Sequence, residues 1–359
     1  MTATGFLTNR MNAQCHYPDR QRRDQQAATM AQPASGDIQF VWHWQPCEIA
    51  GSALFAGAMF RLAHLSDVHL SPLPAIQRHQ LMSKRITGYV NWRVNRMATH
   101  QPEVLQKLLA DLAERSPGHI AITGDLINLG LDGEIENARK WLDGIGKPDN
   151  VSLVCGNHDA YVPGALQKCL QHWQPFVTGD DGRFVYGAED FPYVRRRAGI
   201  SIIGCNSARA TMPFMATGYF RASQALRLAQ ILEHEGAHGQ CRVVLIHHPP
   251  VRGAAPGPGR LVGQSLFRKI IAAHGAELIL HGHTHVDSIH KLAGKDRPVA
   301  VVGVPSGAQA PIAAMRKPAA RYNLFAIGAK LDGWTIDLQE FGYAGPGSEV
   351  ALVGQKRVL

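Results

Sequence analysis

Five short motifs carry the side chains in this sequence that could perform metal-dependent chemistry. They are Asp67-Val68-His69, Gly124-Asp125-Leu126-Ile127-Asn128, Gly156-Asn157-His158-Asp159, His247-His248-Pro249 and Gly282-His283-Thr284-His285, and each lies at or near the end of an apolar, β-rich run. Their candidate ligands are carboxylates, imidazoles and one amide oxygen, with no thiolate. Such a set of N and O ligands suits Mn, Fe or Zn, and it differs from the cysteine ligands of a structural zinc site.

Two metal ions about 3.5–4 Å apart generate a hydroxide at neutral pH and hold a phosphorus centre for in-line displacement. A site of this kind needs one ligand that reaches both ions, and an aspartate carboxylate can do so. Any single motif is a weak signal, because Asp-x-His and His-x-His occur often by chance. The five together indicate a two-metal hydrolytic site.

In this order the motifs resemble the pattern D-x-H, G-D-x-x-[DN], G-N-H-[DE], H-x-P and G-H-x-H of the calcineurin-like metallophosphoesterase family, over about residues 60–330. The resemblance implies two divalent metal ions, with Mn, Fe and Zn as candidates. It places Asp67, His69 and His285 on one metal, Asn157, His247 and His283 on the other, and Asp125 between them.

The H-x-P pattern selects His247 over its neighbour because Pro249 lies two residues further on. Adjacent residues of a strand point to opposite faces, so His248 is expected to be packed or to support the ligands. The resemblance makes His158 the catalytic residue that stabilises or protonates the leaving group. Asp159 is then expected to fix the tautomer of the His158 imidazole, and Asn128 to support the ligands through hydrogen bonds.

Apolar runs alternate with helical spacings along the chain. Strands are predicted at Phe60–Leu65, His119–Thr123, Val151–Val154, Ile200–Cys205, Val243–Ile246, Leu278–Leu280, Val299–Val304, Tyr322–Ile327 and Trp334–Leu338. Helices are predicted at Glu103–Glu114, Glu134–Leu142, Ala222–Glu233 and Ser265–His274. This alternation favours an α/β layered fold with ligands on the loops after the strands. The resemblance implies a four-layer αββα sandwich of two mixed β-sheets flanked by helices.

Residues 59–341 are expected to form the metallophosphoesterase domain, followed by a Gly-containing tail at 342–359. Residues 1–58 show no clear period and contain four Arg and four acidic residues. We expect them to be a disordered extension, or to lie upstream of a natural start at Met59. No basic region directly precedes the weakly apolar residues 49–58, which disfavours a signal peptide, and no run of 18 apolar residues indicates a transmembrane helix.

The segment between the first two motifs has no acidic residue between Asp67 and Glu103. Basic residues alternate there with apolar and aromatic ones, which predicts an inserted helix or helix pair over residues 71–100. The insert either contacts an anionic substrate or a membrane, or packs on the core with a solvated basic face. The candidate substrate residues are Lys84, Arg85, Tyr89, Trp92 and Arg93, together with Arg252 in the Pro- and Gly-rich loop after His247.

The chain of 359 residues is 45% hydrophobic, has a formal net charge of +9, and carries six cysteines without pairing or C-x-x-C spacing. The positive balance favours a small anionic phosphoester substrate, or serves only solubility. The cysteine pattern is typical of a reduced protein. We therefore expect a cytoplasmic location, with peripheral contact at the inner face of the membrane as an option. The oligomeric state stays open.

The strings S-D-V-H-L, G-N-H-D, I-H-H-P-P and G-H-T-H are most similar to the bacterial cyclic-nucleotide phosphodiesterase branch. The leading prediction is phosphodiester hydrolysis by a metal-bridging hydroxide, with a cyclic nucleotide as substrate. The insert is instead similar to the lipid-A branch, which cleaves a UDP-diacylglucosamine pyrophosphate near the membrane. A phosphomonoesterase and a nuclease are further alternatives, although no DNA-binding region is visible. A protein Ser/Thr phosphatase is disfavoured because Leu129-Gly130 follows Asn128 in place of an Arg-Gly pair.

Overall fold

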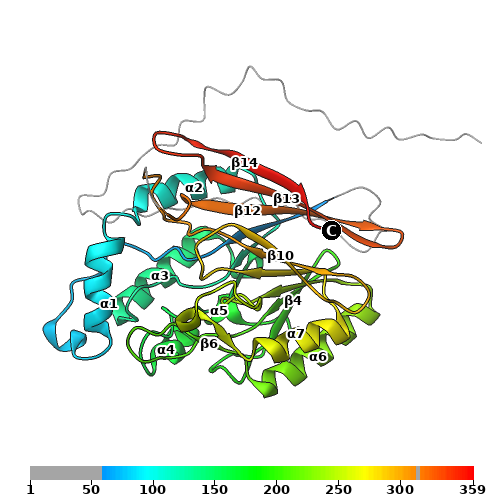
Figure 1. Ribbon diagram of the computed structural model, residues 1–359, viewed down its shortest axis with the longest axis horizontal. Coiled ribbons are helices and arrows are strands. Elements are labelled where there is room, and N and C mark those ends of the chain that lie inside the picture. The colour runs from blue at the N-terminus through cyan, green and yellow to red at the C-terminus, as the bar shows by residue number, and fades with distance from the viewer. Residues whose placement is uncertain (1–58, 313–315) are drawn as a thin grey trace, which may run out of the picture. The chain divides into compact units, whose positions relative to one another are not determined.

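The computed structural model describes residues 59–312 and 316–359. Two six-stranded sheets pack face to face, with helices on their outer sides (Figure 1). This arrangement confirms the expected four-layer αββα sandwich of mixed sheets. The extension predicted at residues 1–58 lies outside the described residues.

The first sheet has the order β14-β13-β12-β1-β2-β3. Its parallel part consists of β1 (Phe60–Leu65), β2 (His119–Ile122) and β3 (Val151–Leu153). Its antiparallel part is formed by β12 (Arg321–Lys330), β13 (Gly333–Tyr343) and β14 (Val350–Arg357). The carboxyl ends of the three parallel strands therefore meet at one edge.

The second sheet has the order β10-β11-β9-β7-β5-β4. Its central strands are parallel: β5 (Ile200–Gly204), β7 (Cys241–Leu245), β9 (Leu278–His281) and β11 (Val299–Gly303). The antiparallel strands β4 (Tyr193–Arg197) and β10 (Ser288–Leu292) form its edges. The short strands β6 (Gly218–Tyr219) and β8 (Leu261–Val262) pair with each other in a separate ribbon.

Successive side chains of a strand point to opposite faces of the sheet, and this alternation builds the two buried layers. In β7, Val243 and Leu245 join the core that includes Leu62 and Leu65 of β1. Val244 points the other way, into a second cluster with α6 (Ala222–Ala237) and α7 (Gln264–His274). On the first sheet, α2 (Pro102–Glu114) packs against β12 and β14. The remaining helices are α3 (Asp132–Ile145), α4 (Ala165–His172) and α5 (Gln174–Val177), with short 3₁₀ turns at Pro148–Asn150 and Gly257–Gly259.

The insert between the first two motifs is helical, as predicted. It comprises the 3₁₀ turn η2 (Arg78–Leu81), α1 (Arg85–Asn91) and a π-helical turn, η3 (Trp92–Arg96), drawn in blue and cyan in Figure 1. Gly88 and Trp92 of this segment are buried. A Cβ atom at Gly88 would lie 2.2 Å from the Tyr161 hydroxyl, so glycine allows α1 to lie directly on that ring.

Of the two alternatives expected for the insert, packing of its apolar face on the core with a solvated basic face does not match the structure. The side chains of Met82, Ile86, Val90, Val94 and Met97 are all exposed instead of packed on the core. The residues that do face the fold are Gly88, Trp92 and the partly buried Arg96, which are spaced four apart. The sequence pattern cannot separate these two faces, because both contain apolar residues.

The chain after the fifth motif also differs from expectation. The expected tail at residues 342–359 contains β14, which pairs antiparallel with β13 and closes the edge of the first sheet. The edge strands β4 and β10 were likewise not predicted, since their polar, half-exposed sequences lack a clear apolar run. Among the described residues no helix combines the length and the apolar character needed to cross a bilayer.

Candidate metal centre

The loops after five parallel strands bring the predicted ligands together. Asp67 and His69 follow β1, Asp125 follows β2, and Asn157 follows β3. From the second sheet, His247 follows β7, and His283 and His285 follow β9. The two sheets thus contribute to one cluster at their shared edge, as expected for ligands placed beyond strand carboxyl ends.

The backbone at this cluster adopts an unusual conformation. Five of the predicted ligands have positive φ angles: Asp67 (52°), His69 (42°), Asp125 (56°), His283 (69°) and His285 (57°). A non-glycine residue in this region costs on the order of 1–3 kcal/mol, and such residues concentrate at functional sites. The glycines that flank the ligands allow the loops to pack closely. A Cβ at Gly282, for example, would lie 1.9 Å from the Ser66 hydroxyl.

One group of donors surrounds Asp67. Its Oδ1 atom lies 3.0 Å from Nε2 of His285, and Nε2 of His69 lies 3.4 Å from the same nitrogen. Two imidazole nitrogens and a carboxylate oxygen at these separations match the edges of a coordination shell with bonds of about 2.0–2.2 Å. Asp67 Oδ1 is fully buried and has no hydrogen-bond partner among the described residues, so an acceptor is directed into the cluster.

A second group of donors surrounds Asn157. Its Oδ1 atom lies 2.8 Å from Nδ1 of His283 and 3.2 Å from Nε2 of His247. The two groups are connected, because the backbone N–H of His283 donates to Oδ2 of Asp67 at 2.9 Å.

Asp125 stands between the two groups. Its Oδ2 atom lies 3.4 Å from Nε2 of His247 and 3.9 Å from Nε2 of His69. Its other oxygen, Oδ1, accepts the backbone N–H of His158 at 2.7 Å, which fixes the carboxylate. One oxygen therefore faces a histidine of each group, which is the position a bridging ligand must occupy.

Hydrogen bonds set the imidazole tautomers in favour of a cation. Nδ1 of His69 faces the carbonyl of Ile127 at 3.2 Å, and Nδ1 of His247 faces the carbonyl of Thr123 at 2.5 Å. A nitrogen opposite a carbonyl must carry the proton, so both Nε2 lone pairs point into the cluster. The donor set and its tautomers fit divalent metal ions.

Burial controls the protonation of these ligands. It holds the pKa of His69 well below its usual range and lowers that of His283 to about 3, so both imidazoles are neutral at pH 7. His247 differs: burial opposes its charge, but the carboxylate of Asp125 outweighs burial and raises the pKa to about 9. Metal binding at His247 must therefore displace a proton.

Asp159 does not have the role predicted for it. Its two carboxylate oxygens accept the backbone N–H groups of Asp125, Leu126, Ile127 and Gly156, at 2.7–3.3 Å. Nδ1 of His158 instead faces the carbonyl oxygen of Asn128 at 2.7 Å. Asp159 thus fastens the second and third motif loops together, and a backbone carbonyl orients His158. Sequence proximity suggested a carboxylate–histidine pair that the turn geometry prevents.

The two residues predicted to support the ligands make hydrogen bonds beside the cluster. Asn128 donates from Nδ2 to the carbonyl of Leu70 at 3.1 Å and so ties the first and second motif loops together. His248 is buried, with Nδ1 2.8 Å from the Ser207 hydroxyl and Nε2 3.0 Å from the carbonyl of Ala216. Both ring nitrogens of His248 are therefore occupied outside the cluster, although its ring lies 4.4 Å from that of His283.

Two residues of the insert region reach the cluster although they are not among the predicted site residues. Arg96 places Nη2 3.0 Å from Nε2 of His158, and Nη1 3.4 Å from Nδ1 of His69. His100 is buried beside His69 and His285, with ring centroids 5.3 and 6.1 Å away. The lack of acidic residues in the insert was a signal for a basic contact, but nothing in the sequence distinguished Arg96 from its four basic neighbours.

The predicted substrate residues make their own contacts with neighbouring parts of the fold. The guanidinium of Arg85 donates to the carbonyls of Leu129 and Gly130, at 3.1 and 2.6 Å, and so anchors α1. Lys84 donates to the hydroxyl of Thr211 and the carbonyl of Met215. Trp92 is buried and cannot stack on a ligand at the surface. Tyr89 stacks on Trp92 and Arg93 extends over Tyr89, while Arg252 is exposed on its loop.

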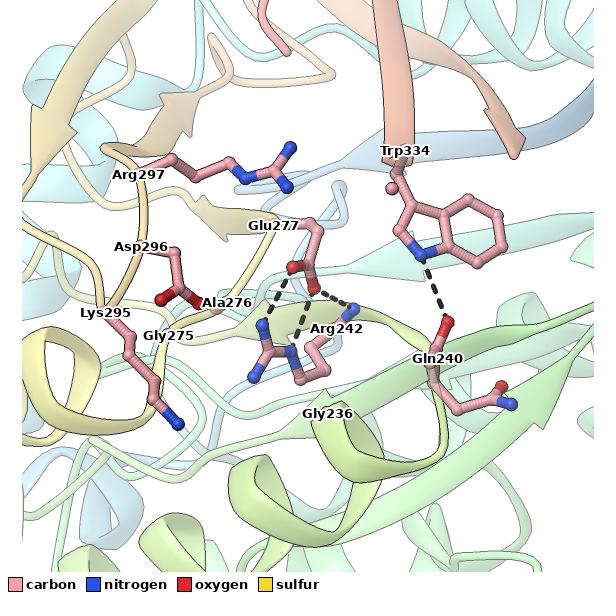
Figure 2. Close-up of a pocket in the computed structure, with 12 residues that line it drawn as sticks. Gly236, Gln240, Arg242, Gly275, Ala276, Glu277, Lys295, Asp296, Arg297 and Trp334 are labelled. Atoms are coloured by element: carbon pink, nitrogen blue, oxygen red, sulfur yellow. Dashed lines mark hydrogen bonds and ion pairs between the residues drawn. The ribbon is translucent and has the colours of Figure 1, made fainter. Parts of the chain in front are cut away.

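A separate pocket shares no residue with the cluster (Figure 2). It is lined by the ends of α6 and α7 and the residues that follow them, by the segment 295–297 between β10 and β11, and by the start of β13. Its central charges are satisfied internally, since Arg242 and Glu277 form a two-pronged ion pair with Nη2–Oε1 at 2.8 Å and Nε–Oε2 at 3.0 Å. We therefore assign the Arg242–Glu277 ion pair in this pocket a structural role, and we place the chemistry at the cluster.

Comparison with known proteins agrees with this geometry. The profile of the Calcineurin-like phosphoesterase family matches residues 60–287. A probable cyclic nucleotide phosphodiesterase of Synechococcus sp. is 28% identical over 188 residues, which cover 50% of this chain and 62% of that relative. The chain thus spans less than two thirds of that relative's length.

A crystal structure of a dimetal phosphatase from Danio rerio matches with a TM-score of 0.52 at 11% identity, covering 82% of this chain and 98% of that one. At this identity the likeness shows the fold alone. The family profile covers more than half of the chain and includes all five motifs. The chain therefore belongs to the calcineurin-like phosphoesterase family of metal-dependent phosphoester hydrolases.

Proposed function

We propose that this chain hydrolyses a phosphodiester at a two-metal centre. The observation that carries the proposal is the position of Asp125, whose Oδ2 atom faces His247 at 3.4 Å and His69 at 3.9 Å. Asp67, His69 and His285 would hold one metal, Asn157, His247 and His283 would hold the other, and Asp125 would be the ligand shared between them. Mn, Fe and Zn all suit this N/O donor set.

Two divalent ions, when bound, supply a nucleophile at neutral pH and neutralise charge for in-line displacement at phosphorus. The chain's own residues supply the remaining functions. The Arg96 guanidinium reaches the edge of the cluster and can donate to a phosphoryl oxygen through two N–H groups. His158, held by the Asn128 carbonyl, presents Nε2 toward the same place, and once Nε2 has taken up a proton from solvent it can donate that proton to the leaving oxygen.

A cyclic nucleotide is the proposed substrate. The Synechococcus relative with the matching name supports this choice, as do the motif strings. A lipid-linked pyrophosphate of the UDP-diacylglucosamine type is the second candidate. It is favoured by one observation, the exposed apolar side chains of the insert from which Arg96 enters the site.

A substrate panel tests both candidates. After chelation, the protein is supplied with Mn, Fe, Zn or Mg and assayed on a chromogenic phosphodiester, a chromogenic phosphomonoester, cyclic AMP and a UDP-linked lipid. We expect the diester to be cleaved faster than the monoester, and Asp125→Asn to abolish the activity and release metal. If no metal supports cleavage of any diester, the proposed function is wrong. Preference for cyclic AMP or for the UDP-lipid decides between the candidates.

A further inference from the structure

An exposed apolar surface runs along the insert and onto a neighbouring loop. We call it the apolar rim, and it consists of Met82, Ile86, Val90, Val94, Met97, Met212, Phe214 and Met215. Three of its members are among the most exposed large apolar side chains described: Phe214 at 86%, Met82 at 85% and Val94 at 72%. Contiguous exposed apolar residues mark interaction surfaces, whereas isolated ones need no explanation.

The two parts of the rim are joined by Lys84. Its ammonium group donates to the Thr211 hydroxyl at 2.7 Å and to the Met215 carbonyl at 3.0 Å. Ile86, Val90 and Val94 are spaced four apart, so they share one helix face opposite the buried Gly88 and Trp92. The rim therefore points away from the fold.

The tip of the loop is held in a costly conformation. Phe214 has a φ angle of 64° although it is neither glycine nor asparagine. A bulky residue in this left-handed region costs on the order of 1–3 kcal/mol, and no burial of the ring offsets that cost among the described residues. The loop thus presents an aromatic ring outward at a free-energy cost.

The charge around the rim is one-sided. No acidic residue occurs in residues 68–102, 191–232 or 236–276, the segments that hold the insert, the loop with Phe214 and the loop with Arg252. The backbone N–H of Ala216 donates to the carbonyl of Pro258 at 2.8 Å, so the last two segments are adjacent. Arg78, Arg93 and Arg252 are exposed and form no ion pair within the described residues.

We propose that the apolar rim docks on an anionic lipid bilayer. Protruding methionine, valine and phenylalanine side chains enter the boundary between headgroups and acyl chains, while surrounding arginines attract anionic headgroups. A protein groove would not require the uniform positive charge, and a nucleic acid would not favour eight exposed apolar side chains. Arg96, on the same helical segment, faces the metal centre, so docking brings that centre to the bilayer surface. The inference does not depend on which phosphoester is hydrolysed.

Vesicle sedimentation tests the inference without an activity assay. The full chain is mixed with vesicles of phosphatidylcholine alone, or of phosphatidylcholine with phosphatidylglycerol, at low and high salt. We expect binding to the anionic vesicles only, weakened by salt. The triple variant Met82→Ser, Val94→Ser, Phe214→Ser should bind at least about tenfold more weakly, because three inserted side chains are lost. The matched control Leu226→Ser, Leu331→Ser removes exposed apolar side chains away from the rim and should bind like the wild type.

Insertion is checked separately with Val94→Trp and Leu331→Trp in vesicles that carry brominated acyl chains. Added fluorescence quenching for the first variant but not the second supports docking through the rim. Three results would overturn the proposal. They are no binding to anionic vesicles at low salt, equal binding by the triple variant, and a dimer in sedimentation velocity that the triple variant dissociates. The last result would assign the rim to a second copy of the chain.

Discussion

The Nη2 atom of Arg96 lies 3.0 Å from Nε2 of His158, and Nδ1 of that ring faces the carbonyl oxygen of Asn128 at 2.7 Å. His158 therefore carries its proton on Nδ1, and its Nε2 accepts from the guanidinium. Burial, followed by the charge of Arg96, lowers the pKa of His158 to about 3. A phosphoester that draws Arg96 onto its own oxygens removes the donor from Nε2, so that Nε2 can take up a proton from solvent and donate it to the leaving oxygen. The two residues therefore act together on substrate.

Replacing Arg96 should impair catalysis more than replacing any other basic residue of the insert. Arg96→Gln is expected to lower kcat/KM by about 10²–10³, as for other donors aimed at a transition-state charge. The matched control is Arg93→Gln, in the same π-helical turn, whose only described side-chain hydrogen bond is to the Tyr89 hydroxyl at 3.4 Å. It should stay within about twofold of the wild type on a small diester. Equal effects of the two variants would assign Arg96 a general electrostatic role.

His158→Ala should leave the metal content unchanged, because Nδ1 of His158 faces the carbonyl of Asn128 and its Nε2 faces Arg96. We expect kcat to fall by about 10²–10⁴, the range of a positioned acid or base. The loss should be smaller for substrates with good leaving groups, such as nitrophenol, than for alkyl esters. A loss that does not vary with the leaving-group pKa would favour pure charge stabilisation over proton donation.

The five motifs predicted the neighbourhood of the centre but not how its parts are held. The family resemblance of the motifs implied the seven candidate ligands, the apolar runs put them on loops after strands, and the structure brings them together. The sequence could not show that the Asp159 carboxylate accepts hydrogen bonds from four backbone N–H groups, because these bonds depend on how two loops turn toward each other. The contact of Arg96 with the cluster could not be predicted for a similar reason. Arg96 and Arg93 share one π-helical turn, and only the direction in which that turn points each side chain distinguishes them.

The choice between the adjacent histidines is open to a direct measurement. His247, His248 and His283 each offer one ring nitrogen within 4.8 Å of those of the other two, so proximity alone does not identify the ligand. We expect His247→Gln to lose one metal per chain, since its Nε2 faces the cluster. His248→Gln should retain both metals, since Ser207 and Ala216 occupy both of its ring nitrogens. Elemental analysis after gel filtration distinguishes the outcomes, and metal loss in the second variant alone would reverse the assignment.

The apolar runs predicted the central strands closely because each is buried on both sides. β1 ends where expected, at Leu65, and β7 begins only two residues before its predicted start at Val243. The edge strands β4 and β10 were missed because their environment alternates between protein and water and leaves only a weak apolar signal. β14 has the sequence Val-Ala-Leu-Val-Gly-Gln-Lys-Arg. It forms a strand because it pairs with β13, and this pairing is a tertiary contact that the sequence pattern does not show.

A buried carboxylate away from the metal centre gives a prediction of pH-dependent stability. Glu235 of α6 accepts hydrogen bonds from Arg196 of β4 and from the Ser201 hydroxyl of β5 at 2.5 Å. Burial alone would raise the pKa of Glu235, but these bonds outweigh it and lower the pKa from 4.5 to about 2. The interaction is therefore fully present above pH 4.5 and is lost as the pH falls from there toward 2, because the unfolded chain binds a proton first.

Glu235→Gln should lower the free energy of unfolding at pH 7 by about 2 kcal/mol, the scale of hydrogen bonds to a charged group. The control is Glu233→Gln on the same helix, whose carboxylate is 74% exposed and should matter little. Denaturant unfolding of metal-free protein at several pH values removes metal loss as a second cause. The gap between wild type and Glu235→Gln should narrow steadily below pH 4.5. A gap that stays constant down to pH 3 would mean that packing of the side chain, and not its charge, supports this junction of α6 with the second sheet.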